Sequence, residues 1–350
     1  MGDGKKIAPH SPFNCTLRLG IGELLAFILL IGVGSAHAQT SFQYFRLGSP
    51  QDIKTAATGG IAMMGGGSDL DEAFRWLCNK GSGGDFLVLR ATGDDGYNSY
   101  VNGLCKMNSV ATLIIPDRRA ALDQAVAQII RDAEVIFIAG GDQSNYVRSW
   151  GGTPVDDAIN AHIAAERPIG GTSAGLAVLG EFVFGSLKDK PDDNDLASTE
   201  VLPNPYFYRV TLIRRFLRIP LFENLLTDSH FVTRDRMGRS LGFLARIMQD
   251  GWSQSPREAA VDERSALLVE ADGSAKVVGD GKGVYFLRPL EGPKDCKPGE
   301  PLTISNVRVF RVSDGGHFDL RSWTSTEGIA YSLSVDRGKL QSTQGDGSIY

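Results

Sequence analysis

Residues 168–179 read PIGGTSAGLAVL, which is the pattern of a strand that turns sharply into a helix. A short apolar step, Pro168-Ile169, leads into a glycine-rich turn and then into an apolar helical start. Gly171 to Gly175 spell G-x-S-x-G, which places a serine on a sharp change from strand to helix. Such a turn exposes the hydroxyl of Ser173 at the edge of a sheet, and the following amide, that of Ala174, can hold an oxyanion. The alternative is a turn in which Ser173 only caps the helix.

The amino-terminal side of this turn alternates between strand and helix patterns. Buried strands are expected at residues 86–89, 111–115, 135–139 and 168–169, with helices at 69–79, 118–131 and 155–166. This alternation predicts an α/β fold with a doubly wound, mostly parallel sheet. The ligand crevice of such a sheet lies beyond the carboxyl ends of its strands.

The carboxyl-terminal side has a different pattern. Residues 188–205 are charged and contain proline, so they are expected to form an exposed loop, and a helix is expected over 234–249. Further strand-like runs occur at 265–270, 283–287, 302–312 and 329–335, which predict extra carboxyl-terminal strands. We expect an α/β domain over residues 39–290 and a strand-rich extension over 291–350.

The first 38 residues have the organisation of a secretory signal. Basic residues precede an apolar run at 19–33, and Ala36-His37-Ala38 supplies the small residues that a signal peptidase reads. A membrane anchor is the alternative, but this run is shorter than the roughly 20 apolar residues that span a bilayer. We therefore expect cleavage after Ala38, a secreted or periplasmic protein, and no membrane attachment of the mature chain.

Composition and cysteine usage narrow the function classes. The chain has 36 lysines and arginines against 41 acidic residues, a net charge of -5, so nucleic acid is not an expected partner. In an oxidising compartment Cys78 and Cys105, which follow helical patterns of similar length, are the expected disulfide, and Cys296 is left over. None of these cysteines has the spacing of a metal site, and no metal or organic cofactor is expected.

A serine nucleophile needs a base, and the mature chain has three histidines. His162 lies within a predicted helix at the far end of the sheet, and His317 lies in a turn of the late strand-rich region. His230 lies just before a helix, where another strand end is expected. It is therefore the leading candidate by elimination.

Two further features belong to the same predicted crevice. The turn Gly140-Gly141-Asp142-Gln143 follows another strand end, so the amide of Gly141 is expected to complete the oxyanion site while Gln143 reaches substrate. Arg236 and Arg239 are one helical turn apart and suit a carboxylate, although a solvated charged face is the alternative.

The acid that orients the base stays open. Asp189, which lies 16 residues after Ser173, is the first candidate, with Asp192, Asp193 and Glu200 as rivals.

In order and spacing, these pieces resemble the serine peptidase family that contains cyanophycinase and the aspartyl dipeptidases. The matching motifs are Gly140-Gly141-Asp142-Gln143, Gly171-Thr172-Ser173-Ala174-Gly175, Asp228-Ser229-His230-Phe231 with Arg239 beyond it, and Val261-Asp262-Glu263. The resemblance covers roughly residues 59–287 and implies a fold like that of class I glutamine amidotransferases, with serine replacing cysteine. By position it implies Ser173 as the nucleophile and His230 as the base. It also implies a substrate pocket with Gln143, Asp228, Ser229 and Arg239.

The resemblance implies a serine peptidase that forms an acyl-enzyme and cleaves aspartyl or β-aspartyl peptides. Its leading substrate is cyanophycin, a polyaspartate polymer that carries arginine on its side chains. The expected partners are this peptide or polymer and, in a homodimer, a second copy of the chain. Two alternatives remain. An esterase of the α/β-hydrolase fold shares G-x-S-x-G but carries an HGGG-type loop that this chain lacks, and a secreted binding protein would keep the pocket without the chemistry.

Overall fold

The computed structural model describes residues 41–190, 193 and 195–350. The predicted signal sequence and its cleavage site lie outside the described residues, and Asp192 lies outside them too. The described residues form one compact unit by their contacts. Among the described residues, no helix combines the length and the apolar character that crossing a membrane requires.

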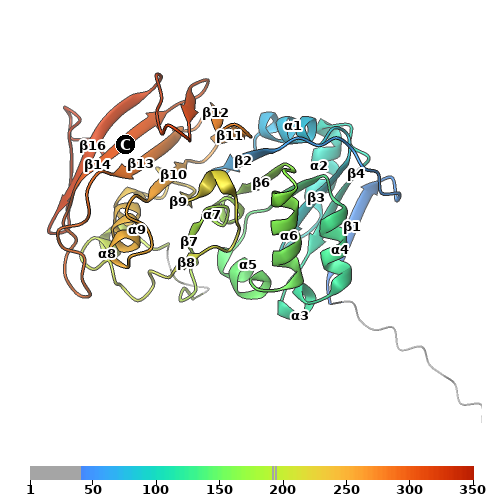
Figure 1. Cartoon of the computed structure of the whole chain (residues 1–350), viewed down its shortest axis with the longest axis horizontal. Helices are drawn as coiled ribbons and strands as arrows, with labels where there is room; N and C mark the ends of the chain where they lie inside the picture. The colour runs from blue at the N-terminus through green and yellow to red at the C-terminus, as the bar shows by residue number, and fades with distance from the viewer. Residues whose placement is uncertain (1–40, 191–192, 194) are drawn as a thin grey trace, which may run out of the picture. The chain divides into compact units, whose positions relative to one another are not determined.

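The first sheet has nine strands with a parallel centre (Figure 1). Strands β4, β3, β5, β6 and β2 are parallel neighbours, while β1, β11, β12 and β15 join antiparallel at the two sides. In spatial order the strands are β1 (Gln43–Gly48), β4 (Ser109–Ile114), β3 (Asp85–Arg90), β5 (Val135–Ile138), β6 (Ile169–Thr172), β2 (Gly60–Met64), β11 (Ala266–Glu270), β12 (Ser274–Val278) and β15 (His317–Asp319).

The second sheet has eight strands and is mostly antiparallel. Within this sheet, β9 pairs in parallel with β7 on one side and with β10 on the other, and all three strands follow the turn at Ser173 in the sequence. In spatial order the strands are β17 (Lys339–Ser342), β16 (Ile329–Asp336), β14 (Ile304–Val312), β13 (Val284–Pro289), β10 (Arg257–Val261), β9 (Leu225–Asp228), β7 (Phe182–Phe184) and β8 (Leu212–Arg214). The predicted α/β fold with extra carboxyl-terminal strands is therefore confirmed, with its strands divided between two sheets.

The predicted helices are present with differences at their boundaries, and the helices at Gly96–Leu104 and Gln143–Trp150 were not predicted. The helices are α1 (Asp71–Lys80), α2 (Gly96–Leu104), α3 (Arg118–Ala121), α4 (Gln124–Asp132), α5 (Gln143–Trp150), α6 (Pro154–Ala164), α7 (Ala174–Ala177), α8 (Ser198–Val201) and α9 (Met237–Gln249), with a 3-10 turn η1 (Pro220–Phe222). The single helix expected at 118–131 breaks because the Asp123 side chain caps a new helix by accepting from the amide of Ala125. The helix expected from residue 234 begins only at Met237, and the expected loop at 188–205 contains α8.

Strand periodicity explains how the parallel sheet is covered on both faces. Leu87 and Leu89 pack in one apolar cluster with residues of α4, α5 and α6, while Phe86 and Val88 pack in another with residues of α1 and α2. Successive side chains of a strand point to opposite faces, so a strand buried on both sides has a continuous apolar sequence. This arrangement leaves the strand ends as the places where polar side chains can gather.

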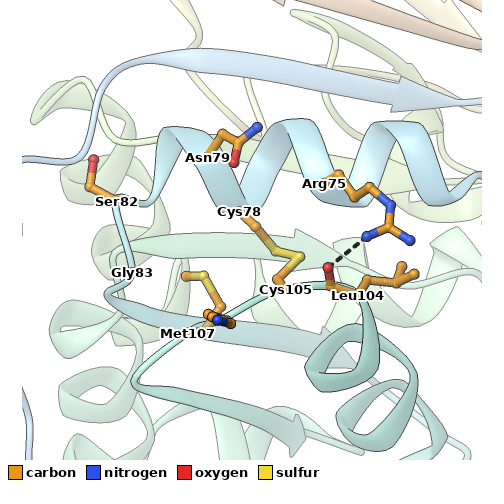
Figure 2. Close-up of a pocket in the computed structure, with 9 residues that line it drawn as sticks. Arg75, Cys78, Asn79, Ser82, Gly83, Leu104, Cys105 and Met107 are labelled. Carbon is orange, nitrogen blue, oxygen red and sulfur yellow. Dashed lines mark hydrogen bonds between the residues drawn. A yellow bond between two sulfur atoms is a disulfide. The ribbon is translucent and has the colours of Figure 1, made fainter.

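The predicted disulfide between Cys78 and Cys105 is confirmed. It joins α1 to the segment after α2, beside a pocket that Figure 2 shows. Arg75 on α1 donates to the carbonyl of Leu104 at 2.8 Å, so a hydrogen bond supports the same junction. Cys296 is unpaired and buried.

Candidate active site

Three side chains meet where strands of both sheets end. Ser173 follows the last residue of β6, His230 lies two residues beyond β9, and Glu263 lies two residues beyond β10. The Oγ of Ser173 lies 2.7 Å from Nε2 of His230, and Nδ1 of the same ring lies 2.5 Å from Oε1 of Glu263. The predicted contact between residues 173 and 230 is therefore present. The arrangement is the serine, histidine and carboxylate relay of serine hydrolases.

The backbone at Ser173 has the geometry of a nucleophile turn. Its φ of 53° and ψ of -117° lie in a region that side chains rarely adopt, at the first residue before α7. The turn is tight because Gly175 packs against β5. A Cβ on Gly175 would lie 2.0 Å from the carbonyl oxygen of Ile138. Only glycine fits at position 175, and the strained backbone of Ser173 holds its hydroxyl toward His230.

The imidazole of His230 has the protonation state of a general base. Burial lowers the pKa of His230 below its usual value, and the cations Arg234 and Arg236 lower it further, although the hydrogen bond to Glu263 raises it. The ring is therefore neutral near pH 7, and Nε2 can accept the hydroxyl proton of Ser173 while Nδ1–H donates to the carboxylate.

A glycine loop after β2 closes on the ring of His230. The amide of His230 donates to the carbonyl of Gly65 at 2.9 Å, and a Cβ on Gly66 would lie 2.4 Å from Cε1 of the imidazole. Gly66 has a φ of 96°, which side chains rarely adopt, so both space and backbone require glycine. Sequence reasoning missed this loop, although a run of three glycines directly after an apolar stretch is a visible signal.

The predicted oxyanion donors lie beside the nucleophile. A Cβ on Gly140 would approach the Cβ of Ser173 to 3.4 Å, so the turn that contains Gly141 borders the serine. Ala174 supplies the first amide of α7, where helix amides lack partners within the helix. Gly141 and Ala174 therefore both lie close to Ser173, and the role of their amides as oxyanion donors stays a prediction. Gln143 lies at the start of α5, and its side-chain amide donates to Oγ of Ser186 at 3.0 Å.

The predicted acid, Asp189, is wrong. Its Oδ1 accepts from Nε of Arg209 at 2.7 Å, and the contact with His230 is made by Glu263. Of its rivals, Glu200 also pairs with Arg209, at 3.3 Å. The reason is the parallel pairing of β9 with β10, which brings the residues after both strands to one edge. The signal was present in Val261-Asp262-Glu263, the last of the motifs in the sequence.

The expectation that Asp228 and Arg239 bind substrate is contradicted by their burial. Arg239 is 1% exposed and forks onto Asp228, with Nη2 2.7 Å from both carboxylate oxygens. Arg236 donates to Oδ1 of Asp228 at 3.0 Å and to the carbonyl of Ser229 at 2.8 Å. Ser229 is 3% exposed. This network fixes the segment that immediately precedes His230, so its members position the base and are not accessible to a ligand.

The other two histidines do not join the relay. His162 is buried with its Nε2 3.0 Å from the carbonyl oxygen of Pro168, and burial lowers its pKa to about 4. His317 is exposed and lies 3.1 Å from a carboxylate oxygen of Glu327. The choice of His230 by elimination agrees with this placement.

One carboxylate group among the described residues has the spacing of a metal site. Asp52, Asp85 and Glu134 each offer an oxygen, and these oxygens lie within 4.8 Å of one another. Two side-chain cations offset part of the group's charge, since Arg46 pairs with Asp85 at 3.0 Å and Lys54 with Asp52 at 3.0 Å. Asp85 begins β3, at the edge opposite to the serine, so these carboxylates take no part in the relay.

Comparison with known proteins finds similarity to one family of peptidases. A family model described as peptidase family S51 matches residues 94–203. The cyanophycinase of Synechococcus elongatus is 27% identical over 223 residues, which are 62% of this chain and 62% of that protein. The cyanophycinase of Trichormus variabilis is 26% identical over 216 residues, 60% of this chain and 65% of that protein. The matches thus span less than two thirds of these relatives. Among solved structures, a peptidase from an acI-B1 actinobacterium has a TM-score of 0.47 at 18% identity and covers 75% of this chain and 97% of its own.

Proposed function

We propose that this chain is a serine peptidase of the family that includes the cyanophycinases, to which it is similar, and that it hydrolyses aspartyl or β-aspartyl peptides through an acyl-enzyme. The observation that carries the proposal is the pair of contacts at 2.7 Å and 2.5 Å that joins Ser173, His230 and Glu263. A catalytic serine needs both a base and a group that fixes the orientation of that base.

The reaction follows from the roles of these groups. His230 takes the proton of Ser173 as its Oγ attacks the scissile carbonyl, and Glu263 stabilises the imidazolium that results. The amides of Gly141 and Ala174 stabilise the oxyanion of the tetrahedral intermediate. The imidazolium then protonates the leaving amine, and a water molecule, deprotonated by the same imidazole, releases the acyl group and restores the serine.

The substrate class rests on an accessible cation near the base. Arg234 lies four residues after His230, and its side chain is 44% exposed. Its guanidinium lies 3.7 Å from the carboxylate of Asp195. We assign to Arg234 the carboxylate-binding role that sequence reasoning gave to Arg239, since a guanidinium forks well onto a carboxylate. Cyanophycin, a polymer with a polyaspartate backbone, is the leading substrate within this class, and peptides with an amino-terminal aspartate are the second.

We propose further that the chain acts outside the cytoplasm. The disulfide between Cys78 and Cys105 supports this, because such bonds persist mainly in oxidising compartments. Fractionation of cells that express the full chain tests it, and mature protein retained in the cytoplasm would contradict it.

Mass spectrometry of the products from cyanophycin and from aspartyl and β-aspartyl dipeptides tests the activity. The Ser173→Ala variant is expected to lose hydrolysis while keeping the circular dichroism spectrum of the parent. A fluorophosphonate probe is expected to label the parent at Ser173. Undiminished turnover by Ser173→Ala, or a parent that neither takes up the probe nor cleaves any of these peptides, would overturn the proposal.

A further inference from the structure

A second polar pocket lies at the opposite edge of the strands that carry the relay. It has a volume of about 180 Å³ and is lined by Ser255, Arg257, Arg288, Arg321, Ser322 and Trp323, among others. Arg257 is the first residue of β10, whereas Glu263 follows the carboxyl end of that strand. The length of β10, about 16 Å at 3.3 Å per residue, therefore separates this pocket from the relay.

At this edge of the sheet, the neighbouring strands β10, β13 and β14 each carry an arginine at adjacent positions. Arg288 of β13 pairs directly with Arg308 of β14. The register of β10 with β13 ends at Glu258 opposite Leu287, and one further step places Arg257 beside Arg288. Burial lowers the pKa of Arg257, and the neighbouring charge of Arg288 lowers it further. Like charges directly opposite each other destabilise a sheet, so this arrangement favours an anion nearby.

Backbone carbonyls hold Arg257 in place, and two nearby carboxylates, Glu223 and Asp272, act on the pocket's arginines without forming an ion pair. Within the described part of the chain, no ion pair includes Arg257, Arg288 or Arg321. Arg257 donates to the carbonyls of Leu320 at 2.9 Å and Glu223 at 3.1 Å, and its guanidinium lies 4.7 Å from the centre of the Trp323 ring. Carbonyl partners orient a guanidinium without cancelling its charge. In a chain with a net charge of -5, this pocket thus contains three guanidinium groups that form no ion pair with any described residue.

Trp323 gives an independent indication of a missing acceptor. Its side chain lines the same pocket and is 4% exposed, yet its Nε1–H has no hydrogen-bond partner among the described residues. A buried donor without a partner destabilises the fold, and buried indole N–H groups normally find an acceptor. An oxygen of a bound anion would satisfy this donor beside the guanidinium of Arg257.

We propose that this pocket binds an oxyanion, the shared chemistry of a small carboxylate and of inorganic phosphate. The arginines provide charge and forked donors, and Trp323 provides a further donor. This proposal does not depend on the chemistry at Ser173, because the ligand is bound and released without reaction at the other edge of the strands.

Isothermal titration of the parent with inorganic phosphate and, separately, with succinate tests the proposal. Binding of at least one of them is expected, and Arg288→Glu is expected to weaken it by about tenfold or more, since it replaces an unpaired cation by an anion. Trp323→Phe keeps the ring and removes the N–H, and a smaller loss of about threefold is expected. The matched control is Arg119→Glu, which makes the same charge change at an exposed arginine of α3.

The outcomes separate the two sources of the anion. Binding of succinate alone identifies a carboxylate site, binding of phosphate alone a phosphate site, and mutual competition a site for both. Where Arg288→Glu does not fold, Arg288→Gln removes the charge at similar length. The proposal is overturned if neither anion binds at about 10 mM, or if a substitution at Arg288 changes affinity no more than Arg119→Glu does.

Discussion

Replacing Glu263 by glutamine measures how much the negative charge that faces His230 contributes to catalysis. The carboxylate accepts from Nδ1 of the ring at 2.5 Å, and an amide oxygen of nearly the same size and position can still accept this hydrogen bond. The variant therefore preserves the shape of the site, and the ring keeps its tautomer when the amide presents its oxygen, not its NH2, to Nδ1. What it removes is the charge that stabilises the imidazolium formed in the transition state.

The structure bounds the size of this effect. Two unit charges about 4 Å apart attract each other by about 4 kcal/mol at the effective dielectric constant typical of protein surfaces. The side chain of Glu263 is 28% exposed and borders a cavity of about 540 Å³, so solvent screening reduces this value, by about half at most. A loss of about 2 to 4 kcal/mol corresponds to a decrease in kcat of about 30-fold to 1000-fold.

The assay compares kcat of the parent, Glu263→Gln and Asp189→Asn on a β-aspartyl dipeptide. Asp189→Asn is the matched control, because it neutralises a carboxylate that pairs with Arg209 and does not contact the imidazole. We expect its kcat to stay within about twofold of the parent. A parent-like kcat for Glu263→Gln, or a large loss for Asp189→Asn instead, would refute the assignment of Glu263.

The pH dependence of kcat/KM reports the protonation of His230, because this base must be neutral to act, and activity is expected to fall as the pH drops through its lowered pKa. Arg234 is one of the cations that lower this pKa. The Arg234→Gln variant is therefore expected to move the acid limb of the profile to higher pH. An unshifted limb would show that Arg234 has no electrostatic effect on the ring. Glu258 is fully buried and burial raises its pKa to about 8, so the folded state binds a proton that the unfolded state releases, and stability falls as pH rises from about 5 to about 8. Urea unfolding at both pH values is expected to show a smaller decrease for Glu258→Gln, and an identical decrease would contradict this. Replacing Cys78 and Cys105 by serine opens a loop with a sequence separation of 27, and the free energy of unfolding is expected to fall by about 3.5 kcal/mol. Equal urea midpoints for this variant and the oxidised parent would contradict it.

Features encoded by contiguous residues could be predicted from the sequence. The strand, glycine turn and helix around Ser173 are local, and the buried strands of the parallel sheet have continuous apolar runs that need no knowledge of their neighbours. His230 could be chosen because few histidines competed with it. The disulfide was predictable because only three cysteines remain after residue 38.

Tertiary structure alone decided which charges are buried and which carboxylate meets the base. In sequence, Glu263 belongs to one of the matching motifs and Asp189 does not, but the residues around either side chain do not show which of them contacts His230. They differ in this respect only after β10 pairs in parallel with β9, which sets Ala260 opposite Asp228 and brings Glu263 to the edge where His230 lies. Likewise, Arg239 has the helical spacing of an exposed residue, and only the packing of α9 against the end of β9 buries it. Register and burial depend on contacts between distant segments, whereas a turn or an apolar run depends on its own residues. This is why the role of the nucleophile could be assigned from the sequence, and the role of Glu263 within its motif could not.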